Sequence, residues 1–172
     1  GKTSAVENYT GSTWATNPNS LSSARQGSAG TGTGIPSAIV FGGNDGSYTG
    51  VTEEYNVSTN AITAAAWASG NNMNTARKSM YGGSIGTQTA GLAVAGNPGS
   101  PGAVVTNINE EYDGTSWTES GDLNTGRAYL GGFGTQTAAV GCGGYIWPSG
   151  NQNATEEYDG SSWTSGNNMN TT

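Results

Sequence analysis

Residues 107–127 read NINEEYDGTSWTESGDLNTGR, and residues 153–170 read NATEEYDGSSWTSGNNMN. The same order of Tyr, Trp and a polar stretch returns in more diverged form at 4–25 and at 52–77. Self-similarity at a fixed period is the signature of a repeat architecture, and here the period is about 50 residues. The tryptophans that mark the four copies are Trp14, Trp67, Trp117 and Trp163.

Each copy contains a predicted β-hairpin. In EEYDGSSWT an Asp-Gly pair separates two short segments, and this pair favours a type I′ turn, which needs positive φ at both central residues. We therefore expect one strand to end at the repeat tyrosine and the next to begin at the repeat tryptophan. Because Tyr55 and Trp67 lie further apart than in the other copies, that hairpin is expected to have a longer tip. The repeat tyrosines are Tyr9, Tyr55, Tyr112 and Tyr158.

Segments of small and apolar residues that end in glycine complete each repeat. SAIVFGG at 37–43, TAGLAVAG at 89–96 and TAAVGCGG at 137–144 are typical of fully buried strands. Before the last two, ARKSMYGGSIG at 76–86 and GRAYLGGFG at 126–134 predict one further strand each, where paired glycines indicate close backbone approach. Four short strands in about 50 residues describe one blade of a β-propeller, so we expect an all-β fold.

These residues resemble the kelch-type β-propeller repeat. That family has a first strand led by Arg, a second strand ending in Gly-Gly, and Tyr and Trp on the outer strands. The matching glycines are Gly42-Gly43 and Gly143-Gly144, with Ala95-Gly96 in the middle copy. The near-identical copies are also similar to repeat regions of tail-fibre-like proteins from marine phages and metagenomes, which implies a virion-associated or extracellular location.

The chain is expected to form a single domain, 1–172, and the repeat divides this domain into about three and a half blades. The expected units are a half-blade of two outer strands at 4–16 and blades at about 24–68, 76–118 and 126–164. Closed propellers have roughly four to eight blades, so we expect either a homo-oligomer or neighbouring blades of a longer chain to close the ring.

Charged residues that recur once per repeat are expected to be structural. The arginines are Arg25, Arg77 and Arg127. Each is expected to pair with a carboxylate of the Glu-Glu-Tyr unit, since a buried charge is tolerated only when it is paired. The available carboxylates are Glu53, Glu54, Glu110, Glu111, Glu156 and Glu157. The repeat Tyr and Trp side chains are expected to pack between blades.

Composition excludes several functions. The 172 residues include no His, one Cys, five Lys or Arg and twelve Asp or Glu, for a net charge of −7. Without His there is no imidazole base or ligand, and Cys142 alone forms no internal disulfide. The acidic balance argues against nucleic acid as a partner, and no apolar run is long enough for a membrane helix. Adjacent glutamates on a strand point to opposite faces of the sheet, so such a pair cannot flank one bond of a substrate. Because His is absent as well, we expect no enzyme activity, cofactor or metal site.

Segments that differ between copies are the candidate binding elements. The three loops are NDGSYTGV at 44–51, NPGSPGAVVTNI at 97–108 and YIWPSGNQNA at 145–154. Variable loops on a constant framework are how binding surfaces are commonly mounted. Tyr48, Tyr145 and Trp147 are aromatic residues outside the repeat pattern, and such residues suit stacking on a glycan or docking on a protein surface. Two alternatives remain open: local packing of these side chains, and a purely structural repeat.

Overall fold

The computed structural model describes residues 1–9, 12–17, 19–34, 37–56, 66–80, 84–99 and 104–171. Within these ranges the chain forms β-strands and no helix, and it contains three four-stranded antiparallel sheets. The prediction of an all-β fold is confirmed.

The first sheet has the order β3 (Ala29–Gly34), β4 (Ser37–Phe41), β5 (Thr52–Asn56) and β6 (Ala66–Ser69). The second has β7 (Ser84–Thr87), β8 (Ala90–Gly96), β9 (Thr106–Tyr112) and β10 (Trp117–Glu119).

The third sheet and two hairpins complete the described strands. The third sheet has the order β11 (Gly131–Thr135), β12 (Ala138–Cys142), β15 (Thr155–Tyr158) and β16 (Trp163–Ser165). Between β12 and β15 the chain forms a small hairpin of β13 (Tyr145–Ile146) and β14 (Gly150–Asn151). At the other end, β1 (Glu7–Tyr9) pairs with β2 (Trp14–Thr16) as a two-stranded sheet.

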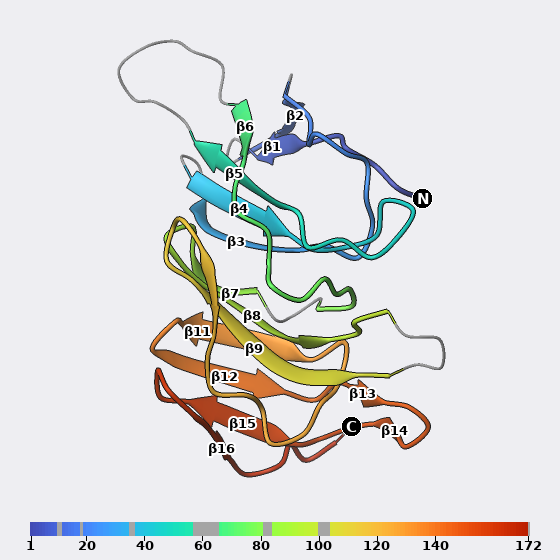
Figure 1. Cartoon of the computed structure of the whole chain (residues 1–172), viewed down its shortest axis with the longest axis vertical. Coiled ribbons are helices and arrows are strands. Elements are labelled where there is room, and N and C mark those ends of the chain that lie inside the picture. The colour runs from blue at the N-terminus through green and yellow to red at the C-terminus, as the bar shows by residue number, and fades with distance from the viewer. Residues whose placement is uncertain are drawn as a thin grey trace.

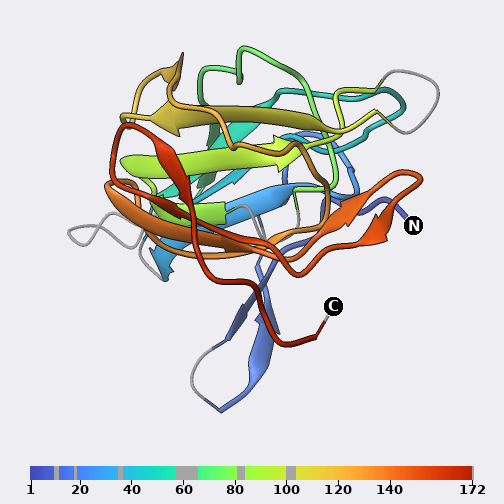
Figure 2. The same ribbon diagram turned by 90° about the horizontal axis from the view of Figure 1, so that it is seen from below.

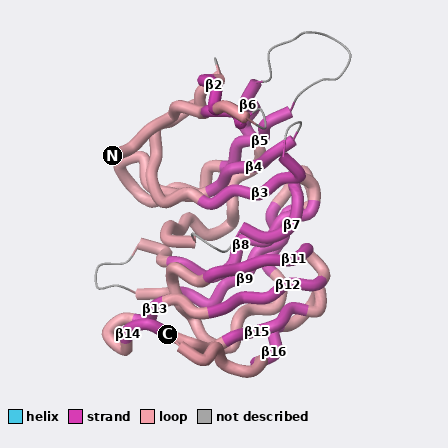
Figure 3. Tube along the Cα trace, turned by 180° about the vertical axis from the view of Figure 1, so that it is seen from behind, coloured by secondary structure: helices cyan, strands magenta, loops and turns pink. Residues whose placement is uncertain are grey.

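The three sheets lie one after another along the long axis of the molecule (Figure 1). Their first strands follow one another, so that β7 contacts both β3 and β11 (Figure 3). The β1–β2 hairpin and the third sheet therefore occupy opposite ends of the stack.

Two apolar cores fill the spaces between consecutive sheets. The core between the first and second sheets includes Phe41 and Trp117, whose rings meet edge-on with centroids 4.9 Å apart. The core between the second and third sheets includes Ile85, Leu92 and Trp163. In both cores large aliphatic and aromatic side chains pack beside a few alanines, such as Ala93 and Ala139, so that the space between two sheets is filled.

The hairpins form where the sequence predicts them, but the predicted type I′ turn is wrong. Four residues, 113–116, separate β9 from β10, and only Gly114 of the Asp-Gly pair has positive φ, at 91°. The Asp113 carboxylate instead accepts hydrogen bonds from the backbone N–H groups of Thr115 and Ser116, at 2.8 and 2.7 Å. The side chain thus stabilises a wider turn. The tip expected between Tyr55 and Trp67 lies outside the described residues.

Burial of the second strands differs between sheets. β8 is buried along nearly its whole length, whereas β12 alternates between buried and more exposed residues. The prediction of a fully buried strand is therefore wrong for 137–144, because one face of the third sheet is not covered by another described sheet. It is also wrong for part of 37–43, since β4 alternates between buried and half-buried residues. Ala95 stands where the other copies have Gly42 and Gly143, and all three have left-handed φ, at 55°, 66° and 64°.

Candidate functional site

The three repeat arginines form buried ion pairs, each with the first glutamate of a Glu-Glu-Tyr unit. Arg77 lies 3.2 Å from Glu110, and both side chains are fully buried. The other two pairs are Arg25 with Glu53 and Arg127 with Glu156. Burial lowers the pKa of Arg77, while the charge of Glu110 opposes that shift. An ion pair buried in this way stabilises the sheet only while both partners are present.

The same glutamates also hold the segment that enters from the preceding sheet. Glu110 accepts the backbone N–H of Asn74 at 2.7 Å, and Glu156 accepts that of Asn124 at 2.7 Å. Glu53 accepts the N–H of Ser22 at 2.8 Å in the equivalent place. Each carboxylate therefore joins its own sheet to the chain leaving the previous one.

The second glutamates act across the junctions between sheets. The Tyr112 hydroxyl donates to Glu54, and the Tyr158 hydroxyl donates to Glu111 at 2.5 Å. Burial, together with the hydrogen bond to Glu111, raises the pKa of Tyr158 from 10.0 to about 12, and burial also raises the pKa of Tyr112. Among the described residues no tyrosine donates to Glu157, which is exposed on the third sheet.

The repeat tryptophans divide into two environments. Trp117 and Trp163 are each 5% exposed, whereas Trp14 is 68% exposed, so the prediction that the repeat rings are buried between units is wrong for Trp14. The Trp117 indole donates to the hydroxyl of Thr52 on the preceding sheet, at 3.1 Å. Tyr55 accepts a hydrogen bond from the Asn17 amide at 3.0 Å. The side chains of Tyr9 and Trp67 lie outside the described part of the chain.

The three variable loops lie along one edge of the stack. Each follows the second strand of its sheet and precedes the third, and the views agree that the β4–β5 loop, the described ends of the β8–β9 loop and the β13–β14 hairpin project to the same side (Figures 1 and 2). We call this side the loop edge. It is built on sheets fixed by the buried ion pairs, so its parts are held in register by the framework.

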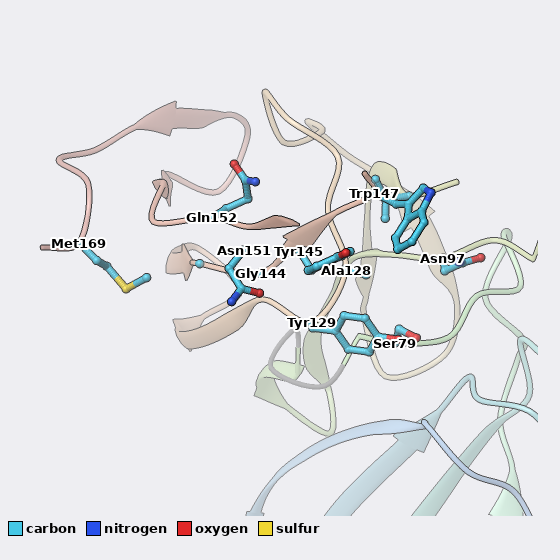
Figure 4. Close-up of a pocket in the computed structure, with 12 residues that line it drawn as sticks. Ser79, Asn97, Ala128, Tyr129, Gly144, Tyr145, Trp147, Asn151, Gln152 and Met169 are labelled. Atoms are coloured by element: carbon cyan, nitrogen blue, oxygen red, sulfur yellow. The ribbon is translucent and has the colours of Figure 1, made fainter. Parts of the chain in front are cut away.

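A pocket of about 650 Å³ opens on the loop edge. It contains Tyr145 and Trp147, two of the three predicted aromatic residues, whose ring centroids are 6.3 Å apart. Figure 4 shows Trp147, Tyr129, Asn97 and Ser79 gathered in one part of it. Gln152 and Met169 lie toward its other side. The described residues that line it are Ser79, Asn97, Val105, Ala128, Tyr129, Gly143, Gly144, Tyr145, Trp147, Asn151, Gln152 and Met169.

Tyr48, the third predicted residue, does not line this pocket. The Lys78 ammonium lies 4.3 Å from the centre of its ring, a cation–π contact. The Tyr48 ring also lies so close to Gly99 that a Cβ added there would meet it at 1.8 Å. Tyr48 thus packs between neighbouring loops of the loop edge, as the local-packing alternative predicts for it.

The β13–β14 hairpin presents Trp147 to solvent. Tyr145 pairs with Asn151, and its backbone exchanges hydrogen bonds with Ala128 at 2.7 and 3.0 Å. Trp147 follows at the hairpin turn, with a cis peptide bond to Pro148, and is 60% exposed. The base of the hairpin is therefore tied to the start of the third sheet, while its aromatic tip is accessible.

Tyr129 is a pocket residue that the sequence analysis missed. It is 54% exposed and has φ of 58°, although a bulky side chain seldom adopts this conformation. The two equivalent positions, two residues after the repeat arginine, carry Gly27 and Ser79, and both also have positive φ. An aromatic residue where the other copies have small ones was the available signal; the left-handed φ is common to the three copies and belongs to the framework.

The pocket lining is uncharged and mixes aromatic with amide groups. Asn97 accepts the N–H of Gly99 at 2.8 Å, which orients its side chain at the pocket. The Gln152 amide donates to the carbonyl of Gly150 at 2.9 Å. Rings that offer a flat apolar face beside fixed amide groups are suited to a ligand with both apolar faces and hydroxyl groups.

Other kinds of site receive no support from the described residues. Nowhere among them do three or more His, Cys, Asp or Glu side chains cluster as metal ligands would. Cys142 is a free, half-buried thiol on β12. The described residues include no helix long and apolar enough to cross a membrane.

Comparison with known proteins shows the fold alone. No family model and no curated protein matches the chain. Among solved structures, that of YjhT is similar, with a TM-score of 0.68 and 15% sequence identity. The match covers 90% of this chain and 49% of the YjhT chain, so this chain spans about half the length of that neighbour.

Proposed function

We propose that the protein is a non-catalytic recognition module that binds glycans through the pocket on its loop edge. The observation that carries the proposal is the exposed Trp147 ring beside Tyr129 and Tyr145 in an uncharged pocket of about 650 Å³. Aromatic faces stack on the apolar faces of sugar rings, and the amides of Asn97 and Asn151 would hydrogen-bond to sugar hydroxyl groups.

We further propose that the sheets are kelch-like propeller blades in a phage or extracellular appendage. The three consecutive four-stranded antiparallel sheets and the Arg, Glu, Tyr and Trp contacts that they repeat support the blade interpretation. A rigid repeat framework with one variable edge suits an appendage that displays binding loops. Among the described residues, those that line the pocket are aromatic, amide, hydroxyl and small apolar side chains, which suit binding of a neutral ligand.

The test is a glycan array probed with the labelled protein. We expect signal on neutral saccharides, and we expect Trp147→Ala and Tyr129→Ala each to abolish most of it. Val104→Ala is the matched control, because it trims an exposed apolar side chain of the same edge outside the pocket lining. Binding that survives Trp147→Ala at full strength would show that the pocket is not the glycan site.

A purely structural role is the second candidate. It is favoured by the exposed Trp14 and Phe133 at opposite ends of the stack, which suit assembly. An array without signal for folded wild-type protein would favour this candidate.

A further inference from the structure

The two junctions between consecutive four-stranded sheets contain the same hydrogen bonds, and at both the donors lie on the later sheet and the acceptors on the earlier one. At each one, a tyrosine hydroxyl of the later sheet donates to a glutamate of the earlier sheet, as in Tyr158 with Glu111. A glutamine of the later sheet also donates to the backbone of the earlier one: Gln136 donates to the carbonyl of Tyr112 at 2.9 Å, and Gln88 to that of Tyr55 at 3.4 Å. A junction therefore joins two different faces.

On the face of a sheet that packs against the next sheet, residues paired across neighbouring strands form a row. In the second sheet Ile85 pairs with Leu92, which pairs with Glu111. Ile85 and Leu92 are fully buried against the third sheet, in the core that includes Trp163. Two apolar side chains followed by a carboxylate thus form one half of a junction.

The same half is exposed on the third sheet. Phe133 pairs with Val140, which pairs with Glu157, in the register of the row above. Phe133 is 63% exposed and Glu157 is exposed. We call Phe133, Val140 and Glu157 the tail face. A large exposed aromatic beside a carboxylate repeats the buried arrangement without its covering sheet.

The complementary half is exposed at the other end of the stack. Tyr9 pairs with Trp14 in the β1–β2 hairpin, just as Tyr112 pairs with Trp117 in the second sheet. Trp117 is 5% exposed and Trp14 is 68% exposed. Glu7 is also exposed, at the position where the sheets have the glutamates that hold an incoming segment. We call Glu7 and Trp14, with the Tyr9 position, the head face.

We propose that the head face of one copy of this chain binds the tail face of a second copy, head to tail. The two faces carry the tryptophan and carboxylate parts of a junction that the chain already forms twice within itself. The head is a two-stranded hairpin, so it offers the outer strands of that junction and no counterpart of Gln136. They lie at opposite ends of the molecule (Figure 1), which prevents one copy from satisfying both. Contacts between unlike faces close into rings or extend as filaments.

Two copies are the expected closed form. A ring of two copies is the smallest closed assembly in which every head face and every tail face is covered. Such a pair would bury Trp14 and Phe133 at each of two equivalent junctions, and it would leave both loop edges accessible.

The first test is the solution mass of the 172-residue chain, measured by light scattering over a range of concentrations. We expect twice the 17.3 kDa of a single chain, and a higher multiple also follows if the contacts extend without closing. A folded protein that stays a monomer at every concentration overturns the proposal.

The second test uses variants of each face. Trp14→Asp on the head and Glu157→Lys on the tail should each give folded monomers, because every junction needs both faces. Glu119→Lys, an equal charge change at an exposed position of β10, should leave the assembly intact. Circular dichroism and the melting temperature report whether each variant remains folded.

Mixing the two monomeric variants tests whether the contact joins a head face to a tail face. The mixture retains one intact head and one intact tail, so we expect it to form a heterodimer of the two variants. If Trp14→Asp dissociates the wild-type assembly while Glu157→Lys does not, the contact joins two head faces and the head-to-tail proposal is wrong. These experiments measure mass and not glycan binding, so a failure of the head-to-tail proposal would leave the glycan proposal intact.

Discussion

Arg77 and Glu110 are both fully buried, so the charge of each is tolerated only because the other neutralises it. Arg77→Ala leaves the Glu110 carboxylate without its partner, and we expect the free energy of unfolding to fall by about 3–5 kcal/mol. Urea denaturation followed by tryptophan fluorescence measures this. Lys2→Ala removes an exposed positive charge and should change stability little. Equal unfolding midpoints for Arg77→Ala and wild type would contradict the structural role of the arginines.

Gly42 and Gly143 have nearly the same φ, at 66° and 64°, but different surroundings. A Cβ at Gly42 would meet the carbonyl oxygen of Arg77 at 2.9 Å. One at Gly143 would meet the flexible end of Met169 at 3.1 Å and the carbonyl oxygen of Gln152 at 3.5 Å, an ordinary contact distance. Conformational strain should lower the stability of either alanine variant by about 1–2 kcal/mol.

The close approach should make Gly42→Ala the more harmful of the two variants. Chemical denaturation of both, side by side, measures the difference. A larger loss for Gly143→Ala would show that the packing around Arg77 does not constrain this turn.

Ionisation of Tyr158 should lower the stability of the folded protein at alkaline pH. Its pKa rises from 10.0 to about 12 in the folded protein, because burial and the bond to Glu111 favour the neutral phenol. The stability linked to this group is fully present below pH 10 and is lost as the pH rises toward 12. Thermal melting between these values should show a steeper loss for wild type than for Tyr158→Phe. Identical pH profiles for the two proteins would count against the linkage.

At the scale of the element, the hairpin turn of the last repeat depends on an ionised carboxylate. Asp159 accepts the backbone N–H groups of Ser162 and Ser161, each at 2.8 Å. These bonds, with that from the Ser161 hydroxyl, lower the pKa of Asp159 from 3.8 to about 2. Their contribution is present above pH 3.8 and is lost as the pH falls toward 2.

An acid titration followed by NMR tests this turn. The amide signals of Ser161 and Ser162 should move with a midpoint near pH 2, and Asp159→Ala should remove that transition. A midpoint at or above the ordinary value of 3.8 would mean that the carboxylate does not hold the turn.

The repeat predicted the strands well because each strand of a sheet is encoded locally. Tyr112 ends β9 and Trp117 begins β10, as the repeated pattern indicates. The turn type was wrong because the Asp113 carboxylate accepts the N–H groups of Thr115 and Ser116 and so stabilises a four-residue connection, which the Asp-Gly pair alone does not reveal. Burial of β12 was overestimated because covering a sheet depends on a neighbour, which the local sequence does not specify.

The candidate site was predicted only in part. Variable loops directed attention to Tyr145 and Trp147, which do line the pocket. Tyr48 looked equivalent in sequence, but Lys78 and the loop at Gly99 cover its ring. Tyr129 escaped notice because it lies inside the repeat, although it is an aromatic residue where the equivalent positions carry Gly27 and Ser79.

At the scale of the whole molecule, framework and loop edge have separate roles. Buried Arg–Glu pairs and the Tyr–Glu bonds between sheets fix the stack, and the pocket is attached along one edge of it. The end faces carry the exposed Trp14 and Phe133. Assembly through the ends would therefore leave recognition at the loop edge undisturbed.

The most direct test of glycan recognition is an NMR titration of the wild-type protein with neutral oligosaccharides, monitored at the tryptophan indole N–H groups. The chain has five tryptophans, so each reports on its own surroundings. The account predicts a saturable shift of the Trp147 signal, with the Trp14, Trp117 and Trp163 signals unchanged. A Trp147 signal that stays fixed while another tryptophan responds, or no response to any neutral saccharide tested, would contradict it.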